Sequence, residues 1–292
     1  MDLKQVQTGI YETVPLHGRF LYFQLKHDVT ADGLSQCLQS ISDDVDGKSV
    51  VIGFGDAVLN LLQAKGLESL RFPSYETRGV QVPATPAALL LWLRGDDHGD
   101  VTIKGQSLIA KLRSVFDFES AVNVFRYKDG HDLTGYEDGT ENPEGEEAFE
   151  TAFSKSPKGG SYLAIQKWQH DLVSFKAKSK IEQDHTIGRE LESNEELDDA
   201  PESAHVKRTE QEAFEPDTYL LRRSMPYSED DHAGLMFLAF AGTTESFSKI
   251  LAKMVGEEDG IVDALFSFSR PLTGAFFWCP PMKDGKMDLT VI

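Results

Sequence analysis

The chain has 292 residues, enough for two domains of ordinary size, and 40% of them are hydrophobic, as in a globular protein. Its formal net charge of -19 opposes binding to nucleic acid and to anionic membrane surfaces, and no apolar run approaches the roughly 20 residues that span a bilayer. Two isolated cysteines and an N-terminus without a basic or apolar signal region predict a cytoplasmic protein that has no disulfide framework.

Apolar residues in the first 130 positions alternate between the strand period and the helix period. This pattern predicts strands at 18–26, 49–55, 88–95 and 120–127 and helices at 33–41, 56–66 and 105–116. A proline-rich connection precedes the third strand. The order strand, helix, strand, strand, helix, strand is typical of a ferredoxin-like domain.

The second half of the chain repeats this order. Strands are predicted at 161–169, 218–227, 234–241 and 274–281, and helices at 171–195 and 246–256, the latter ending at Gly256. The acidic run 190–203 has few apolar residues and predicts a solvated loop. We therefore expect an α+β fold of two ferredoxin-like domains, 1–130 and 131–292, each a four-stranded antiparallel sheet with packed helices.

The stretch GYEDGTENP, residues 135–143, holds Asp138 in a tight polar turn. In its simplest interpretation Asp138 caps a backbone amide. A calcium loop of the EF-hand type is excluded, because its first, third and twelfth positions would be Thr134, Tyr136 and Gly145, and none of these supplies a carboxylate.

The eight histidines lack the spacings of a multi-histidine metal site, since no HExxH, HxH or His-x3-His pattern occurs. A metal site with a single histidine ligand remains an alternative. Iron in a porphyrin needs only one axial ligand from the protein, because the macrocycle supplies the other four.

Several segments carry a resemblance to a known family. They are IGFG (52–55), GYEDGTENP (135–143), IGR (187–189), SAHVKR (203–208), LLRRSMPY (220–227) and FSRPLTGAFFWCPP (268–281). In type, order and approximate spacing they resemble the dye-decolourising peroxidases, a haem family, and in particular its bacterial B-type group. The resemblance covers most of the chain and is strongest from residue 135 onward.

This resemblance implies an enzyme that reduces hydrogen peroxide through a ferryl intermediate and oxidises aromatic donors such as dyes and phenols. It also implies one haem b per chain, bound in the C-terminal domain, and a homo-oligomer, a dimer or higher. Some relatives carry a C-terminal tail that targets them to encapsulin shells. The residues after the last predicted strand leave little room for such a tail.

Residue by residue, the resemblance implies that His205 is the proximal iron ligand, Asp138 the distal aspartate and Arg222 the distal arginine. Ser224 stands where many B-type relatives carry asparagine, and its hydroxyl reaches less far toward a distal water. Arg189 matches an arginine that pairs with a haem propionate. An alternative role for Arg189 is an ion pair with the surrounding glutamates.

The proposed roles have a physical rationale. Splitting peroxide needs a base that later acts as an acid, which Asp138 can be if a nearby cation such as Arg222 keeps its pKa low. Arg222 would also stabilise charge on the departing oxygen, and we expect activity at mildly acidic to neutral pH. Arg223 should point to the opposite strand face and make a salt bridge or a propionate contact. Asp263 is the candidate acceptor behind His205.

Two other classes of protein compete with the peroxidase. A haem-binding module for haem trafficking or iron release would need His205 and an apolar cavity, but it would have no use for Asp138 and Arg222 together. A ferredoxin-like interaction protein without a cofactor would leave the ordered set of segments unexplained. The sequence therefore favours the enzyme.

Overall fold

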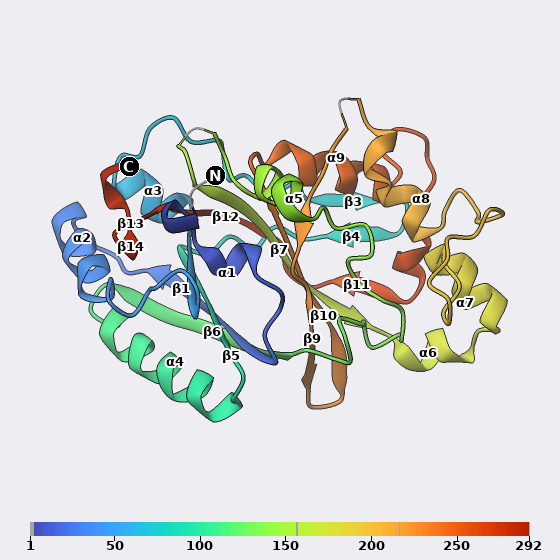
Figure 1. Cartoon of the computed structure of the whole chain (residues 1–292), viewed down its shortest axis with the longest axis horizontal. Helices are drawn as coiled ribbons and strands as arrows, with labels where there is room; N and C mark the ends of the chain where they lie inside the picture. Colours follow the sequence, from blue (N-terminus) through green and yellow to red (C-terminus); the bar gives the residue numbers. More distant parts are fainter. Residues whose placement is uncertain (1–2, 156, 216, 292) are drawn as a thin grey trace.

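The structure, a computed structural model, describes residues 3–155, 157–215 and 217–291 (Figure 1). Its N-terminal half follows the predicted order of elements. These are β1 (His17–Leu25), α2 (Ala31–Ser40), β2 (Val50–Phe54), α3 (Asp56–Leu61), β5 (Leu89–Gly95), α4 (His98–Leu112) and β6 (Phe116–Phe125). Helix α4 begins earlier than predicted, because the Asp97 side chain caps it by accepting a hydrogen bond from the Asp100 amide at 3.0 Å.

The C-terminal half repeats the strand order with different helices. Its main elements are β7 (Ser161–His170), α6 (Leu172–Ala177), α7 (Lys180–Ile187), α8 (His205–Thr209), β8 (Leu221–Arg222), β9 (Met225–Glu229), β10 (His232–Ala241), α9 (Glu245–Met254), β11 (Ser269–Pro271) and β12 (Ala275–Cys279). The shorter elements include α1 (Thr8–Tyr11), α5 (Gly145–Ala152), β13 (Met282–Lys283) and β14 (Lys286–Met287). The stop of α9 at Gly256 is confirmed by the left-handed φ of 70° at that residue.

Two predicted elements were wrong. The expected helix at 171–195 is instead two short helices, because Lys178 and Ser179 are extended and the Ser179 side chain caps the start of α7; Gly188, with a φ of 98°, then ends α7. An added Cβ at Gly188 would lie 3.0 Å from the Cβ of Val206, so a close approach also requires glycine. The expected strand at 218–227 is divided into β8 and β9 around Arg223 and Ser224.

Strand pairing confirms the ferredoxin-like fold of both halves. The N-terminal strands lie in the order β2-β5-β1-β6 and the C-terminal strands in the order β12-β7-β10-β9, and neighbouring strands are antiparallel. When each half is numbered along the chain, both orders are that of the ferredoxin-like sheet, with the first and third strands in the middle.

The two sheets are not separate, however. They join where Trp278 pairs with Phe54 and where Val124 pairs with Tyr227, so that one ten-stranded sheet runs through the molecule. Joining the edges satisfies backbone groups that an exposed edge strand would leave unpaired. The division of the chain between residues 130 and 131 stays a prediction.

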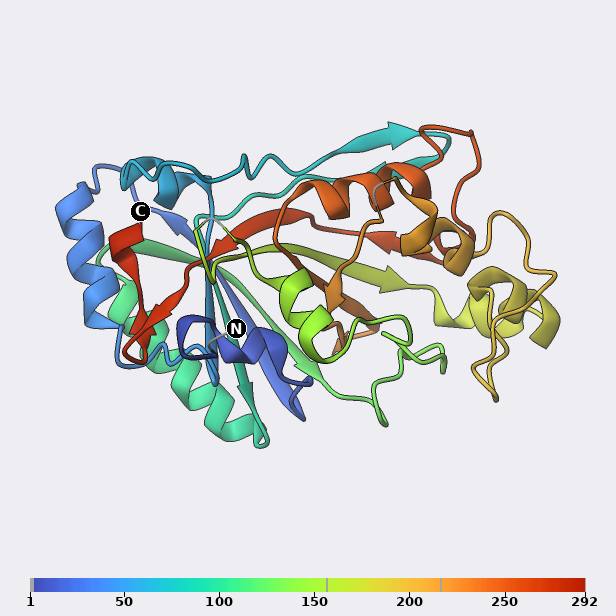
Figure 2. The same cartoon turned by 45° about the horizontal axis from the view of Figure 1, so that its top comes forward.

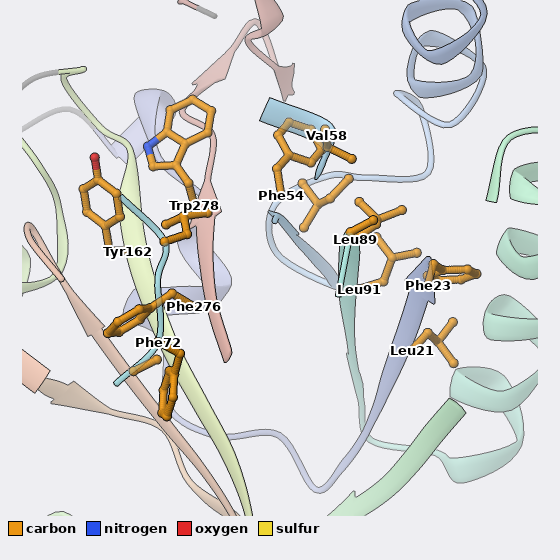
Figure 3. Close-up of a cluster of buried hydrophobic side chains, with 14 of the residues drawn as sticks. Leu21, Phe23, Phe54, Val58, Phe72, Leu89, Leu91, Tyr162, Phe276 and Trp278 are labelled. Carbon is orange, nitrogen blue, oxygen red and sulfur yellow. The ribbon is translucent and has the colours of Figure 1, made fainter. Parts of the chain in front are cut away.

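A hydrophobic cluster crosses from one half to the other (Figure 3). Phe54 and Leu89 from the N-terminal half share this cluster with Phe276 and Trp278 from the C-terminal half. Phe72 packs between rings of the other half, with centroid distances of 5.3 Å to Phe247 and 5.0 Å to Phe276. Burial of each such side chain contributes about 1.5–3 kcal/mol, so the cluster stabilises the two halves together.

Part of the proline-rich connection forms a hairpin that the sequence did not predict. Strands β3 (Tyr75–Thr77) and β4 (Val80–Val82) are joined by Arg78 and Gly79, which both have positive φ. The hairpin reaches over the C-terminal half, close to β11 (Figure 2). Strands of three residues are too short to show an alternating pattern, which explains why it was missed.

No helix within residues 3–155, 157–215 and 217–291 is both long enough and apolar enough to cross a bilayer.

Candidate active site

The C-terminal half contains a cavity between the sheet and the helices that cover it, and about 1000 Å³ of space there, part of it open solvent, is free of protein atoms. Gln166, Trp168 and His170 of β7 line its sheet side, because alternate residues of a strand point to the same face. Helices α8 and α9 and the loop around Asp138 form other parts of its wall (Figure 1).

His205 begins α8 and lines the cavity. Its Nδ1 lies 2.7 Å from Oδ2 of Asp263, whose side chain is fully buried and whose Oδ1 accepts a hydrogen bond from the Leu265 amide. An ionised carboxylate can only accept, so Nδ1 carries a hydrogen toward it, and in a neutral ring Nε2 then keeps a free lone pair. This imidazole is arranged as a metal ligand would be, with a carboxylate behind it.

Asp138 also lines the cavity, at the end of a small hairpin that spans residues 130–138. The Asp138 amide donates to the carbonyl of Gly130 at 3.0 Å, and His131 forms a bridge with Glu137. Gly139, which follows, has a φ of 87°, and an added Cβ would lie 2.6 Å from Nδ2 of Asn142. Glycine is therefore required directly after Asp138, for backbone conformation and for space.

Asn142 connects this loop to strand β8, a contact that the sequence analysis missed. Its Oδ1 accepts from the Arg222 amide at 2.8 Å and its Nδ2 donates to the Arg222 carbonyl at 3.1 Å. This reciprocal pair brings the loop of Asp138 to the strand of Arg222. The preference of asparagine for turns was the available signal, but it does not identify a partner 80 residues away.

Arg222 lines the cavity, and its Nε is buried without a hydrogen-bond partner. Within the described residues, no ion pair joins Arg222 to Asp138. The adjacent Arg223 contacts the opposite side. It donates to the carbonyls of Ile10, Tyr11 and Glu12, and burial lowers its pKa to about 10. The expectation that Arg223 makes a salt bridge or a propionate contact was wrong, because backbone carbonyls at the end of α1 accept its hydrogen bonds.

Two other predicted residues lie outside the cavity lining. Arg189 is paired with the carboxylate of Glu141, lies 3.6 Å from Glu196 and donates to the Asn194 carbonyl at 2.9 Å. In this structure Arg189 therefore makes the ion pair with glutamates that was the alternative to a propionate contact. The hydroxyl of Ser224 is buried and has no hydrogen-bond partner.

A second histidine, His170, was also missed by the sequence analysis. It lines the cavity with Asp132, and its Nε2 lies 3.0 Å from Oδ1 of Asp132 while its Nδ1 lies 2.7 Å from Oγ of Ser269. Burial alone would raise the pKa of Asp132, but hydrogen bonds from His170 and Thr134 outweigh it and lower that pKa. The pair therefore contains an ionised carboxylate.

These features fit a haem. Aliphatic and aromatic side chains provide an apolar lining, and His205 offers one nitrogen lone pair to a metal that would bring its other ligands with it. Gln166 and Arg222 each present an unsatisfied buried nitrogen, Nε2 and Nε respectively. The apolar lining residues include Leu235, Phe237, Phe247, Ile250, Met254 and Phe268.

Comparison with known families identifies the class of protein. The family model described as "Dyp-type peroxidase, C-terminal" matches residues 129–284, which include the cavity loop and His205. The chain belongs to the Dyp-type peroxidase family and is a peroxidase, as the sequence predicted. A dye-decolorizing peroxidase of Rhodococcus erythropolis is 30% identical over 273 residues, which cover 88% of this chain and 79% of that protein. One from Brevibacterium linens is 29% identical, covering 80% and 67%.

Solved structures agree with this assignment. A putative Dyp-type peroxidase from Shewanella oneidensis has a TM-score of 0.84 and 26% identity, over 96% of this chain and 97% of that one. A variant of DypB from Rhodococcus jostii RHA1, solved in complex with haem, has a TM-score of 0.79 and 26% identity, over 92% and 94%.

Proposed function

We propose that this peroxidase is haem-dependent, reduces hydrogen peroxide and oxidises aromatic donors such as dyes and phenols. The observation that carries the proposal is the shared cavity: His205 with its buried Asp263 lines the same space as Asp138 and Arg222. A binding module needs the histidine and the apolar walls, but it has no use for a carboxylate and a free guanidinium together.

His205 would hold the iron of one haem b per chain through Nε2. Asp263 would fix the ring and increase the basicity of that nitrogen. The apolar side chains of α9 and β10 would surround the macrocycle. When bound, haem supplies the redox chemistry, which is the two-electron reduction of peroxide and the one-electron oxidation of donors.

Asp138 would accept a proton from one peroxide oxygen and return it to the departing oxygen. The loop fixes this carboxylate through the Asp138 amide and the glycine that follows. Arg222 would stabilise negative charge on the departing oxygen, and its unpaired Nε leaves donor capacity for that task.

Arg189 and Ser224 have weaker support. To contact a haem carboxylate, Arg189 would give up its ion pair with Glu141, so that one carboxylate partner replaces another. The Ser224 hydroxyl has no partner and would bind a distal water. Homo-oligomer formation and the cytoplasmic location stay predictions.

The test is the absorption spectrum of the haem-reconstituted protein, recorded before and after one equivalent of hydrogen peroxide. We expect a histidine-ligated Soret band that changes rapidly in the wild type and slowly in Asp138→Ala and Arg222→Ala. Slow bleaching, equal in the wild type and both variants, would favour the haem-trafficking alternative. The absence of any haem band would contradict both.

A further inference from the structure

The turn of the hairpin at residues 130–138 is built around the carboxylate of Asp132. Oδ2 of Asp132 accepts hydrogen bonds from the Thr134 amide at 2.8 Å and from its hydroxyl at 2.5 Å. The Asp132 amide donates to the Tyr136 carbonyl, and the Gly135 amide donates to the Asp132 carbonyl, each at 2.9 Å. Displacing this carboxylate would therefore loosen the whole turn that precedes Asp138.

The other carboxylate oxygen, Oδ1, is held by His170 of β7 at 3.0 Å. The His170 side chain is 4% exposed, and its partner on the adjacent strand, Ser269, contacts the second ring nitrogen at 2.7 Å. Because an ionised carboxylate cannot donate, Nε2 carries a hydrogen toward Asp132, and a neutral ring then accepts at Nδ1 from the Ser269 hydroxyl. Both ring nitrogens are occupied, so His170 is not available as a metal ligand.

The cavity loop therefore has two anchors, one on each side of Asp138. His170 holds the turn before it to strand β7, and Asn142 holds the residues after it to strand β8. The two strands belong to one sheet, with β10 paired to both. A loop that is fixed to neighbouring rigid elements holds its side chains more precisely than a free loop does.

We propose that His170 is a positioning residue that holds the carboxylate of Asp138 in place through Asp132. The proposal rests on the proposed role of Asp138 in peroxide reduction. Removing the His170 donor leaves Asp132 buried against an apolar group, a cost that is relieved by movement of the turn. Asp138 then loses the fixed geometry that proton transfer requires.

The first experiment measures amide hydrogen exchange of the apoprotein, which does not depend on haem chemistry. In His170→Phe, the amides of Asp132, Gly135 and Asp138 should exchange about 5–30-fold faster, because one or two kcal/mol of local stabilisation is lost. In His170→Gln, whose Nε2 can still donate to Asp132, exchange should stay close to that of the wild type. His131→Gln, in the same hairpin but with no hydrogen-bond partner at its buried Nδ1, is the matched control.

The second experiment measures the rate of the peroxide-induced spectral change in the haem-loaded protein. His170→Phe should slow it about 5–30-fold, with recovery in His170→Gln. Combined with Asp138→Ala, His170→Phe should cause no further slowing, since its effect passes through Asp138. Asp132→Asn should reproduce the effect of His170→Phe and serves as a second variant if the phenylalanine protein does not fold.

The outcomes separate the two proposals. Unchanged exchange and an unchanged rate in His170→Phe, beside a slow Asp138→Ala, would overturn the positioning role and leave the proposed function standing. Further slowing in the double variant would also overturn it, because His170 would then act independently of Asp138. If Asp138→Ala is as fast as the wild type, the proposed acid–base step fails, and with it the positioning role; the exchange data then still report whether His170 holds the hairpin.

Discussion

The two halves of the chain have the same strand order, but their sheets are covered in different ways. In the N-terminal half, Leu21 of β1 and Leu91 of β5 share an apolar cluster with Leu108 and Leu112 of α4. In the C-terminal half, the equivalent first strand presents Gln166, Trp168 and His170 to a cavity. One fold thus encloses a packed core in one half and forms the wall of a cavity in the other.

The difference originates in the segment after the first strand of each half. Helix α2 follows β1 as a single element, whereas the residues after β7 form three short helices, α6, α7 and α8, with long connections. The last of these short helices begins with His205. The candidate ligand thus lies in the segment that takes the place of a single helix in the N-terminal half.

The largest expected effect is on the cofactor. His205→Ala should abolish the histidine-ligated Soret band, and Asp263→Asn should weaken haem binding by about 10–100-fold, because the carboxylate behind a ligand tunes its affinity. Both are measured by titration of the apoprotein with haem. His185→Ala, at a partly exposed histidine on α7, is the control and should bind haem normally. Equal binding by all of these proteins would show that the cavity does not use His205.

The second effect concerns stability and compares the two sheet coverings directly. Leu108→Ala, in the packed N-terminal half, should lower the free energy of unfolding by about 2–5 kcal/mol, because a fully buried side chain leaves a void. Leu235→Ala should cost less, since Leu235 lines the cavity and is only partly buried. Urea unfolding measures both changes. Equal losses would mean that the cavity wall is as tightly packed as the core.

A smaller effect is expected from Gly139→Ala, which places a side chain at positive φ and costs about 1–2 kcal/mol. Gly66→Ala is a matched control, because Gly66 has a φ of 74° but no atom within 4 Å of an added Cβ. Both variants should lose stability in urea, Gly139→Ala more than Gly66→Ala because its Cβ also meets Asn142, and the peroxide reaction should slow in Gly139→Ala alone. Slowing in both would indicate a general effect of strain.

The smallest effect appears in acid. Asp132 and, in the N-terminal half, Asp46 have lowered pKa values in the folded protein: burial opposes ionisation at both sites, but hydrogen bonds to the carboxylates outweigh it. Each carboxylate therefore contributes stability above its unfolded pKa of about 3.9, and this contribution is lost as the pH falls through the lower folded value.

Comparing Asp132 with Asp46 separates the contribution of His170 to acid stability from that of the other hydrogen-bond donors. Asp132→Asn and Asp46→Asn should each make stability less dependent on pH below about pH 4, in acid unfolding followed by circular dichroism. His170→Phe should reduce the acid dependence that arises from Asp132 and leave that of Asp46 unchanged, because amides and Ser49 hold Asp46. An unchanged acid profile in His170→Phe would argue against the Asp132–His170 contact.

Much of the fold could be predicted from the sequence, because strands such as β7 and β10 are long enough to show their period. The joining of the two sheets could not, since it depends on two pairs of residues at their edges. In the site, the sequence nominated His205 and Asp263, which form a hydrogen bond in the structure. Their roles toward iron stay predictions.

The contacts that the sequence missed are those between distant segments. Asp132 and His170 are 38 residues apart, and Asn142 and Arg222 are 80 apart. Local patterns describe helices and strands, but the choice of one carboxylate for one histidine depends on how a loop packs onto the sheet. Arg223 illustrates the same limit, because its carbonyl partners come from a helix near the opposite end of the chain.

Phe72 and the hairpin that follows it affect whether the C-terminal half can be expressed without the N-terminal half. Residues 131–292 contain every proposed site residue. Their aromatic cluster, however, includes Phe72 of the N-terminal half, and Trp278 at their sheet edge pairs with Phe54 of that half. Expressed alone, that segment would expose apolar rings and a bare strand edge, which are the conditions for aggregation. The N-terminal half thus keeps apolar rings and a strand edge covered in the half that carries the proposed site.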